Sequence, residues 1–233
     1  MNTLIIDYRT NNFEIDNLLR HNCNIIKCPK HPILYSSIDG HPDIQIFIKD
    51  DSIILQNQAN EEFIRILSEN APKKKIILSK KTLEKNYPNN IFLNCLCLNE
   101  YFIHFLKYTD PKIIKAVSDK ILINVKQGYT KCSTAVVSNS AIITSDKSIY
   151  NALINTQIDV LLIPPGDILL PGLEYGFIGG ACGLISEGKL AFFGNLKYYK
   201  YGDEVLKFLC KHNVEPIYLR DDVLIDRGSI LSL

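Results

Sequence analysis

The chain has 233 residues, of which 46% are hydrophobic and 22% are charged, and its formal net charge at pH 7 is +1. This length and composition suit one domain with a sizeable core, and we expect residues 1–233 to form it. A charge so near zero provides no field to attract nucleic acid or an acidic membrane, and no apolar run approaches the ~20 residues of a spanning helix. We therefore expect no membrane association, and nucleic acid is a disfavoured partner.

The seven cysteines are an odd number, and most of them lie inside apolar runs rather than at regular loop spacings. This pattern favours reduced thiols in a cytoplasmic protein over a disulfide framework. Residues 1–7 lack the basic lead, the long apolar centre and the cleavage site of a signal peptide, which agrees with a cytoplasmic location.

Short apolar strands alternate with amphipathic helices along the chain. Hydrophobic periodicity, together with capping and breaking residues, predicts helices over residues 13–21, 60–70, 111–117, 147–155 and 201–212. Apolar runs bounded by turn residues predict strands over residues 3–7, 23–28, 41–49, 53–56, 75–79, 92–98, 120–125, 133–137, 141–144, 160–164, 184–185, 189–193, 216–219 and 229–233. Residues 101–106 fit either a strand or a short helix.

A polar or glycine-bearing segment, here called a lead, recurs before a short apolar run. The clearest lead is Gly128-Tyr129-Thr130-Lys131-Cys132-Ser133-Thr134, which carries a thiol and precedes Ala135-Val136-Val137. Consecutive leads are 52, 37, 50 and 46 residues apart, measured between Asp43, Cys95, Cys132, Cys182 and Gly228. A repeat of this size indicates the blades of a propeller or the turns of a solenoid.

Each repeat reads strand, strand, helix, strand. The chain ends on a lone first strand and begins with the strand, helix and strand that such a unit still needs. A ring leaves no unit end to be capped, whereas an open solenoid does. We therefore predict an α/β propeller of five units, closed by pairing the C-terminal strand with the N-terminal segment.

Five such units in a closed ring resemble the pentein fold, the α/β propeller of the guanidino-group-modifying enzymes (GME fold). These enzymes include arginine and agmatine deiminases, dimethylarginine dimethylaminohydrolase and amidinotransferases. More narrowly, the runs GHPDIQIF, KQGYTKCS, GFIGGACG and DRGSILSL are similar to an uncharacterised, DUF6873-like family of that fold. The resemblance covers the whole chain.

The resemblance extends to individual residues. Deiminases carry a Gly-His-x-Asp lead, which Gly40-His41-Pro42-Asp43 matches. They carry the nucleophile in a Gly-Asn-x-His-Cys-x-Thr lead, which the segment from Gly128 to Thr134 matches at Gly, Cys and Thr. Cys132 lies 91 residues, or two units, after His41, and the family has the same two-unit separation.

Two departures from the family pattern accompany these matches. The deiminase cysteine usually sits at the C-terminal strand, where this chain has Ser232, so His41 and Cys132 would occupy other blades, as in a permuted enzyme. The enzymes of this family bind the guanidinium through two acidic residues. Their positions correspond to the regions near Asp226 and near residues 180–183 in this chain, and the second region contains no acid. The guanidine-binding set implied by the resemblance is therefore incomplete.

The predicted catalytic residues are Cys132, His41 and Asp43. A nucleophilic thiol needs a depressed pKa or a neighbouring base. Lys131 supplies positive charge beside the thiol, and His41 could act as general acid or base, held by Asp43 on the same face of a strand. In the alternative interpretation, Cys132 is a small buried hydrophobe and His41 belongs to a turn before Pro42.

The remaining candidates surround these three. The predicted substrate-binding residues are Lys126, Gln127, Lys131, Gly179, Gly180, Cys182 and Asp226. The stretch 176–183 is neither GxGxxG nor a P-loop, so its glycines would let the backbone approach the axis or a ligand, and Cys182 is a second candidate nucleophile. The Pro- and Gly-rich loop 164–180, with Asp167 and Glu174, would form a pocket wall or lid.

No metal and no cofactor are expected. Four residues of ligand type lie close in sequence, namely His21, Cys23, Cys28 and His31. However, Cys23 and Cys28 would face opposite sides of one strand, unlike a CxxC knuckle.

Two kinds of function stay open. The first is a cysteine-dependent hydrolase or transferase that acts on a small amidine-, amide- or guanidine-like substrate through a covalent intermediate. The second is a non-catalytic pentein that binds a ligand, a protein or the ribosome, as the ribosome anti-association factor of this fold does. An enzyme needs the sulfur of Cys132 within about 4 Å of His41. We expect a small-molecule ligand, and a homo-oligomer stays open.

Overall fold

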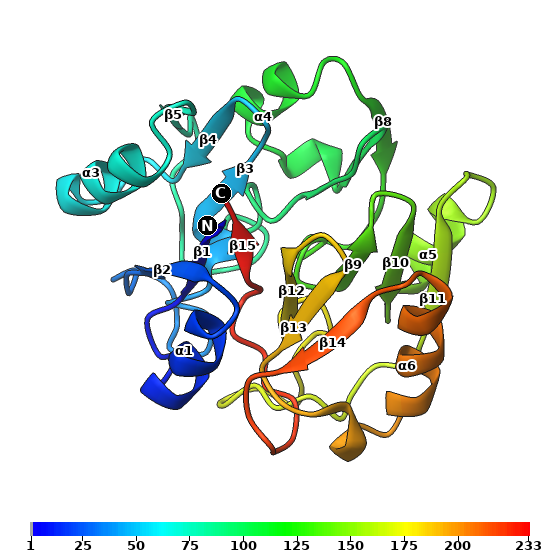
Figure 1. Cartoon of the computed structure of the whole chain (residues 1–233). Helices are drawn as coiled ribbons and strands as arrows, with labels where there is room; N and C mark the ends of the chain where they lie inside the picture. Colours follow the sequence, from blue (N-terminus) through cyan, green and yellow to red (C-terminus); the bar gives the residue numbers. More distant parts are fainter. Residues whose placement is uncertain (1) are drawn as a thin grey trace.

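The computed structural model describes residues 2–233, and over this range the chain forms five three-stranded sheets around a central axis (Figure 1). In every sheet the first strand runs antiparallel to the second, and the second runs parallel to the third. We call each sheet with its helices a blade. The predicted α/β propeller of five strand–strand–helix–strand units is confirmed.

Four blades are continuous in sequence. Their strands are β3 (Ile46–Ile48), β4 (Ser52–Leu55) and β5 (Lys75–Leu78); β6 (Leu96–Cys97), β7 (Tyr101–His104) and β8 (Ile121–Asn124); β9 (Thr134–Ser138), β10 (Ala141–Thr144) and β11 (Asp159–Leu162); and β12 (Cys182–Ser186), β13 (Lys189–Phe192) and β14 (Glu215–Tyr218). The helices are α1 (Asn12–Leu19), α2 (Pro42–Gln45), α3 (Glu61–Asn70), α4 (Pro111–Ala116), α5 (Lys147–Leu153) and α6 (Gly202–Lys211), with short 3-10 helices η1 (Leu106–Tyr108) and η2 (Leu196–Tyr198).

The fifth blade joins the two ends of the chain. Its strands are β15 (Leu231–Ser232), β1 (Asn2–Asp7) and β2 (Cys23–Cys28). Antiparallel pairing sets Leu4 opposite Ser232 and Ile5 opposite Leu231, and Leu233 donates its backbone N–H to the carbonyl of Thr3 at 2.9 Å. The termini accordingly lie side by side in Figure 1, and the predicted closure by the C-terminal strand is confirmed.

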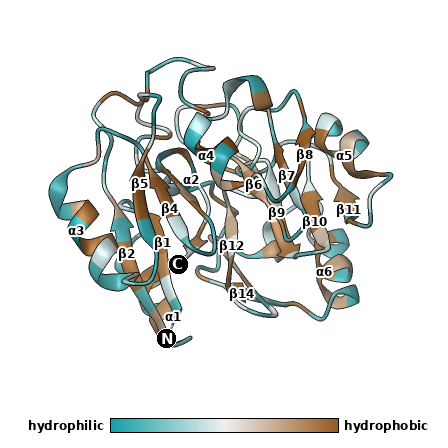
Figure 2. Ribbon diagram, turned by 90° about the horizontal axis from the view of Figure 1, so that it is seen from above, coloured by the Kyte–Doolittle hydropathy of each residue, from teal (hydrophilic) through white to brown (hydrophobic). Residues whose placement is uncertain are grey.

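The core follows the middle strand of each blade. All residues of β4 and β10 are buried, and in β7 and β13 only the first residue is partly exposed. Every residue of β5, β8 and β11 is at least partly exposed, because the third strand lies at the outer edge of its sheet. Figure 2 shows the strands largely apolar, while α3 and α6 alternate apolar and polar faces. No helix within residues 2–233 has the length and apolar character needed to span a bilayer.

The helices α1, α3, α4 and α5 begin where the sequence supplies a capping side chain. Asn11 caps α1 in a reciprocal pair with Glu14, and Asn60 caps α3 by accepting from the backbone N–H of Phe63. Asp146 caps α5 in the same way. Each cap satisfies N–H groups that would otherwise lack partners at the helix start.

The predicted strand over residues 41–49 is wrong in its first half. Residues Pro42–Gln45 form the short helix α2, and only Ile46–Ile48 pair as a strand. Proline at the first helical position has its φ preset for a helix and has no N–H to lose there. The buried amide of Gln45 donates to the carbonyls of Pro29 and Asp39, which holds the helix against the preceding loop. The predicted strand over residues 92–98 is likewise reduced to Leu96–Cys97 by turns at Asn94 and Cys95.

Candidate functional site

The leads that precede the first strands converge on the axis. Seven of their residues form what we call the axial cluster: His41, Asp43, Asn94, Lys131, Cys132, Asp226 and Ser229. They come from four of the five blades, because each lead delivers its side chains to the same end of a first strand.

The thiol of Cys132 lies beside a carboxylate. Its sulfur is 3.4 Å from Oδ2 and 3.6 Å from Oδ1 of Asp226, so the thiol donates to this side chain. The backbone around Cys132 is fixed at both ends, because its N–H donates to Asn94 Oδ1 at 3.1 Å and its carbonyl accepts from the N–H of Gly180 at 2.9 Å. The side chain of Asn94 therefore positions the lead from the neighbouring blade.

His41 is buried next to the same carboxylate. Nε2 lies 3.8 Å from Asp226 Oδ1, and neither ring nitrogen has a hydrogen-bond partner among residues 2–233. One nitrogen of His41, the sulfur of Cys132 and one carboxylate oxygen of Asp43 all lie within 4.8 Å of one another. The fold thus brings the imidazole, the thiol and two carboxylates to one place.

Asp43 does not hold His41 as the sequence predicted. Its Oδ2 accepts from the hydroxyl of Ser229 at 2.8 Å, and its Oδ1 has no partner within the described residues. The ammonium of Lys131 donates to the same hydroxyl at 3.1 Å. The prediction failed because it placed His41 and Asp43 on one strand, whereas they are the cap and the second residue of α2.

Burial dominates the ionisation of the cluster. It raises the pKa of Asp226 to about 7, with further help from Asp43, and it also raises the pKa of Asp43. Burial lowers the pKa of His41 to about 3. The pKa of Cys132 is raised well above its usual range, mainly by burial and further by the negative charges of Asp226 and Asp43. Lys131 opposes this rise without cancelling it, so these neighbours keep the thiol protonated.

Two glycines allow the cluster to close. A Cβ on Gly180 would lie 2.0 Å from Asp226 Oδ1, and a Cβ on Gly228 would lie 2.2 Å from the Cβ of His41. Gly228 also has φ +67, a left-handed conformation that favours glycine. The expectation that glycine lets the backbone approach the axis is confirmed at Gly180, whose carbonyl accepts from the N–H of Ser229 at 2.9 Å.

A cavity of about 300 Å³, here called the mouth cavity, leads to one side of the cluster, and its floor is formed by Cys132, His41 and Asp226. One wall comes from Tyr35, Ile38, Ile44 and Tyr129. The other wall comes from Leu170, Leu173, Glu174, Tyr175 and Phe177, so the predicted loop 164–180 does form a pocket wall. Asp167 does not line this cavity and instead accepts from the N–H of Lys200.

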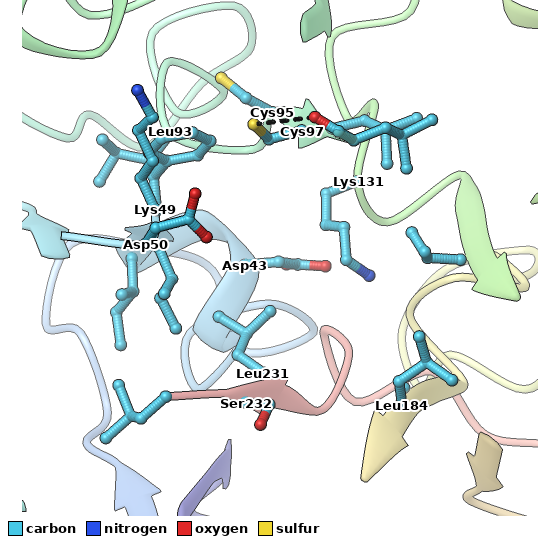
Figure 3. A pocket seen from close by; sticks show the side chains of 18 of the residues that line it. Asp43, Lys49, Asp50, Leu93, Cys95, Cys97, Lys131, Leu184, Leu231 and Ser232 are labelled. Carbon is cyan, nitrogen blue, oxygen red and sulfur yellow. Dashed lines mark hydrogen bonds between the residues drawn. The ribbon is translucent and has the colours of Figure 1, made fainter. Parts of the chain in front are cut away.

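A second cavity of about 490 Å³, here called the basic cavity, lies on the other side of the cluster. Asp43 and Lys131 line it, and Figure 3 shows their side chains pointing toward one another. The other lysines that line it are Lys49, Lys74 and Lys120. Cys132 does not line this cavity.

The other predicted binding residues fall into two groups. Asp226 lies in the axial cluster, and the carbonyl oxygen of Gly179 lies 2.7 Å from Ser229 Oγ. Lys126 is exposed, and Gln127 donates to Asp146, so neither is brought to the cluster. The thiol of Cys182 donates to the carbonyl of Ile178 at 3.2 Å, and burial raises its pKa to about 12.

Sequence reasoning missed Asn94 and Ser229. Both lie in leads that the repeat had identified, Asn94 directly before Cys95 and Ser229 directly after Gly228. The signal was their place in the repeat, because equivalent lead positions meet on the axis of a propeller. The aromatic wall residue Tyr35 carried no such signal.

The cluster contains the one group of three or more metal-binding side chains within residues 2–233, namely His41, Asp43 and Cys132. Thiolate, imidazole and carboxylate are ligand types of Zn²⁺, so these residues could hold such an ion. The four residues of ligand type near the N-terminus, His21, Cys23, Cys28 and His31, form no such group within the described residues. The thiol of Cys23 instead lies 3.6 Å from the carbonyl oxygen of His21. All seven cysteines are free in the described part of the chain.

Comparison with solved structures identifies the fold. An amidinotransferase of the saxitoxin biosynthetic pathway from Microseira wollei matches with a TM-score of 0.56 at 10% identity, covering 94% of this chain and 88% of that chain. The agmatine deiminase of C. jejuni gives 0.54 at 11% identity, covering 93% and 87%. A mutant dimethylarginine dimethylaminohydrolase from Pseudomonas aeruginosa, complexed with citrulline, gives 0.53 at 7% identity, covering 93% and 92%. These likenesses show that the chain has the pentein fold.

The family is shown by sequence. The model of a family of unknown function, DUF6873, matches residues 5–231, and the chain belongs to this family. No curated protein matches it. The resemblance predicted from the four sequence runs is confirmed.

Proposed function

We propose that the protein is a cysteine-dependent enzyme that acts on a small amidine- or guanidine-type cation. It cleaves a C–N bond of this cation and passes the amidino group to water or to an amine. Cys132 is the nucleophile, His41 is the general acid and base, and Asp226 is the carboxylate that pairs with the cation. One observation carries the proposal: a thiol, an unpaired imidazole and a buried carboxylate form the floor of one cavity. The pentein fold shared with an amidinotransferase and an agmatine deiminase supports it.

In the proposed reaction the positive charge of the substrate activates the nucleophile. A positive charge beside Cys132 and Asp226 favours the ionised form of both, opposing the burial that keeps them protonated. His41, with its pKa lowered to about 3, is neutral and has a nitrogen available for the thiol proton. Pairing with the negative thiolate raises the basicity of the imidazole during the reaction.

The bonds change in two steps. The sulfur of Cys132 forms a bond to the central carbon of the cation while its proton passes to His41, which then gives that proton to the departing nitrogen as the C–N bond breaks. For a guanidine this leaves a thiouronium on the sulfur. In hydrolysis, water attacks the same carbon, His41 takes a proton from the water and returns it to the sulfur as the C–S bond breaks. In transfer, an amine takes the place of the water.

A pair of alkylating reagents tests the proposal without knowledge of the substrate. 2-Chloroacetamidine carries the amidinium charge, whereas 2-chloroacetamide is its neutral counterpart. We expect Cys132 to prefer the amidine over the amide at least tenfold relative to Cys210, an exposed thiol in the same chain. The readout is the mass of each cysteine-containing peptide over time.

Two variants test whether the axial cluster causes the preference of Cys132 for the amidine. Asp226→Asn should lower the amidine preference of Cys132, because the carboxylate that pairs with the cation is gone, while Cys182→Ser should leave it unchanged. If Cys132 shows the same ratio as Cys210, the proposed nucleophile is wrong.

One observation favours the competing function, a module that binds a small molecule without turnover. Burial raises the pKa of Cys132 rather than lowering it, and a thiol of this kind is typical of an inert buried cysteine. A binding module would be protected from amidine alkylation by the same cations but would release no amine or ammonia from them. Product analysis with the wild-type protein therefore separates the two functions.

A further inference from the structure

The mouth cavity has a charge pattern that restricts the substrate. Of the twelve residues that line it, drawn from the described range 2–233, none is lysine or arginine. Its acidic residues are Asp226 on the floor and Glu174 at the exposed rim. A positively charged ligand therefore meets a carboxylate at each end of the cavity, whereas a negatively charged group meets no cationic side chain at either end.

The two arginines near His41, Arg9 and Arg227, interact with other carboxylates. Arg9 donates to both carboxylate oxygens of Asp7 and to the carbonyl of Ser36. The guanidinium of Arg227 lies 3.7 Å from the buried carboxylate of Glu14. Neither arginine lines the mouth cavity. A substrate carboxylate in this cavity would lose its hydration without gaining a cationic partner, which is strongly unfavourable.

The aromatic walls of the mouth cavity suit a substrate chain that is aliphatic or positively charged rather than one that carries a carboxylate. Tyr129 and Phe177 lie with ring centroids 6.4 Å apart, and Tyr175 meets Phe177 edge-on at 6.5 Å. Aromatic faces attract cations and pack against methylene chains. The volume of about 300 Å³ is at the small end of ligand pockets, so the cavity suits a free small molecule.

Resting on the proposed function, we propose that the substrate is a small amidinium or guanidinium compound whose tail ends in an amine and carries no carboxylate. The amidinium end reaches Asp226 and Cys132 on the floor. The methylene chain lies against the rings of Tyr129 and Phe177, and the terminal ammonium meets Glu174 at the rim.

Three guanidines that differ in one group test this proposal. Agmatine has the amine tail, arginine adds a carboxylate to it, and butylguanidine has neither. Binding is measured by calorimetry with Cys132→Ser, which lacks the nucleophile and therefore cannot turn the ligands over. We expect agmatine to bind at least tenfold more tightly than arginine, and butylguanidine to bind between them or near agmatine.

Two further variants locate the discrimination. Glu174→Gln, in the Cys132→Ser background, should weaken agmatine a few-fold and leave butylguanidine unchanged, as expected for an exposed ion pair; Glu187→Gln, at another exposed site, should change neither. Leu173→Arg, at a wall position that is 48% exposed, should strengthen arginine binding by supplying the missing partner for its carboxylate.

The outcomes separate this inference from the proposed function. If arginine binds as tightly as agmatine, the tail assignment is wrong while the guanidine site stands. If Glu174→Gln leaves agmatine unchanged, Glu174 is not the partner of the amine. If none of the three guanidines binds, the proposed function fails, and the tail assignment fails with it.

Discussion

Asp226 should make the folded protein less stable as pH rises, which is the reverse of most carboxylates. Its pKa in the folded protein is about 7, against an ordinary value of 3.8. A raised pKa means that the folded state binds the proton more tightly than the unfolded chain does, so the contribution to stability is complete below pH 3.8 and is lost as pH rises through about 7. At ~1.4 kcal/mol per pH unit, the loss between pH 5 and pH 8 is about 3 kcal/mol.

Asp226→Asn isolates this contribution. The amide cannot ionise, although it loses one of the two acceptor contacts with the backbone N–H groups of Phe177 and Gly228. That loss gives an offset of about 1–3 kcal/mol that does not change with pH. We therefore compare the pH dependence, not the absolute stability.

The assay is urea unfolding at half-unit steps from pH 5 to pH 8.5. The free energy of unfolding of the wild type, minus that of Asp226→Asn, should fall by about 3 kcal/mol across this range. Asp16→Asn, an exposed position on α1, is the control and should leave the difference flat. A flat difference for Asp226→Asn as well would refute the raised pKa.

Four further results are expected. Ser229→Ala removes the hydroxyl that donates to Asp43 and should cost about 1–3 kcal/mol in unfolding free energy; no loss would mean that this contact is not maintained. Gly180→Ala places a Cβ against the carboxylate of Asp226 and should destabilise by about 1–3 kcal/mol or more, with a smaller loss in an Asp226→Ala background; an equal loss in both backgrounds would contradict the clash. Zn²⁺ should protect Cys132 from alkylation, reversibly with EDTA, because its ligand types match; unprotected labelling would count against a metal-binding geometry. Binding of agmatine to Cys132→Ser should release roughly three-quarters of a proton at pH 6.5 and little at pH 8.5, since Asp226 has a pKa of about 7; calorimetry in two buffers measures this, and equal release at both pH values would exclude Asp226 as the source.

The sequence predicted the architecture because repetition and periodicity are local signals. The spacing between leads and the lone strand at the C-terminus together required a partner at the N-terminus, and β15 does pair with β1. The error over residues 41–49 has a physical origin. Ile44, Ile46 and Ile48 alternate like a strand, but Pro42 starts a helical turn and the buried amide of Gln45 completes it with contacts to distant carbonyls.

The site was harder to predict because its contacts join different blades. Asp226 and Cys132 are 94 residues apart, and Ser229 and Asp43 are 186 apart. Sequence adjacency suggested that Asp43 orients His41, whereas the fold presents Asp226 to the imidazole. The ionisation of Cys132 was also beyond sequence reasoning, because burial outweighs the neighbouring ammonium of Lys131.

The directions of these pKa shifts together explain how one site can be buried and yet suited to a cation. A protonated thiol, a neutral imidazole and a carboxylate that ionises near pH 7 carry little charge by themselves, which limits the cost of burying them. A cation that enters the mouth cavity reverses this balance, because its charge favours the ionised carboxylate and the thiolate at once. A neutral amide of the same shape would bring no such charge. In the proposed function, selection for a cation and activation of Cys132 are therefore one electrostatic event.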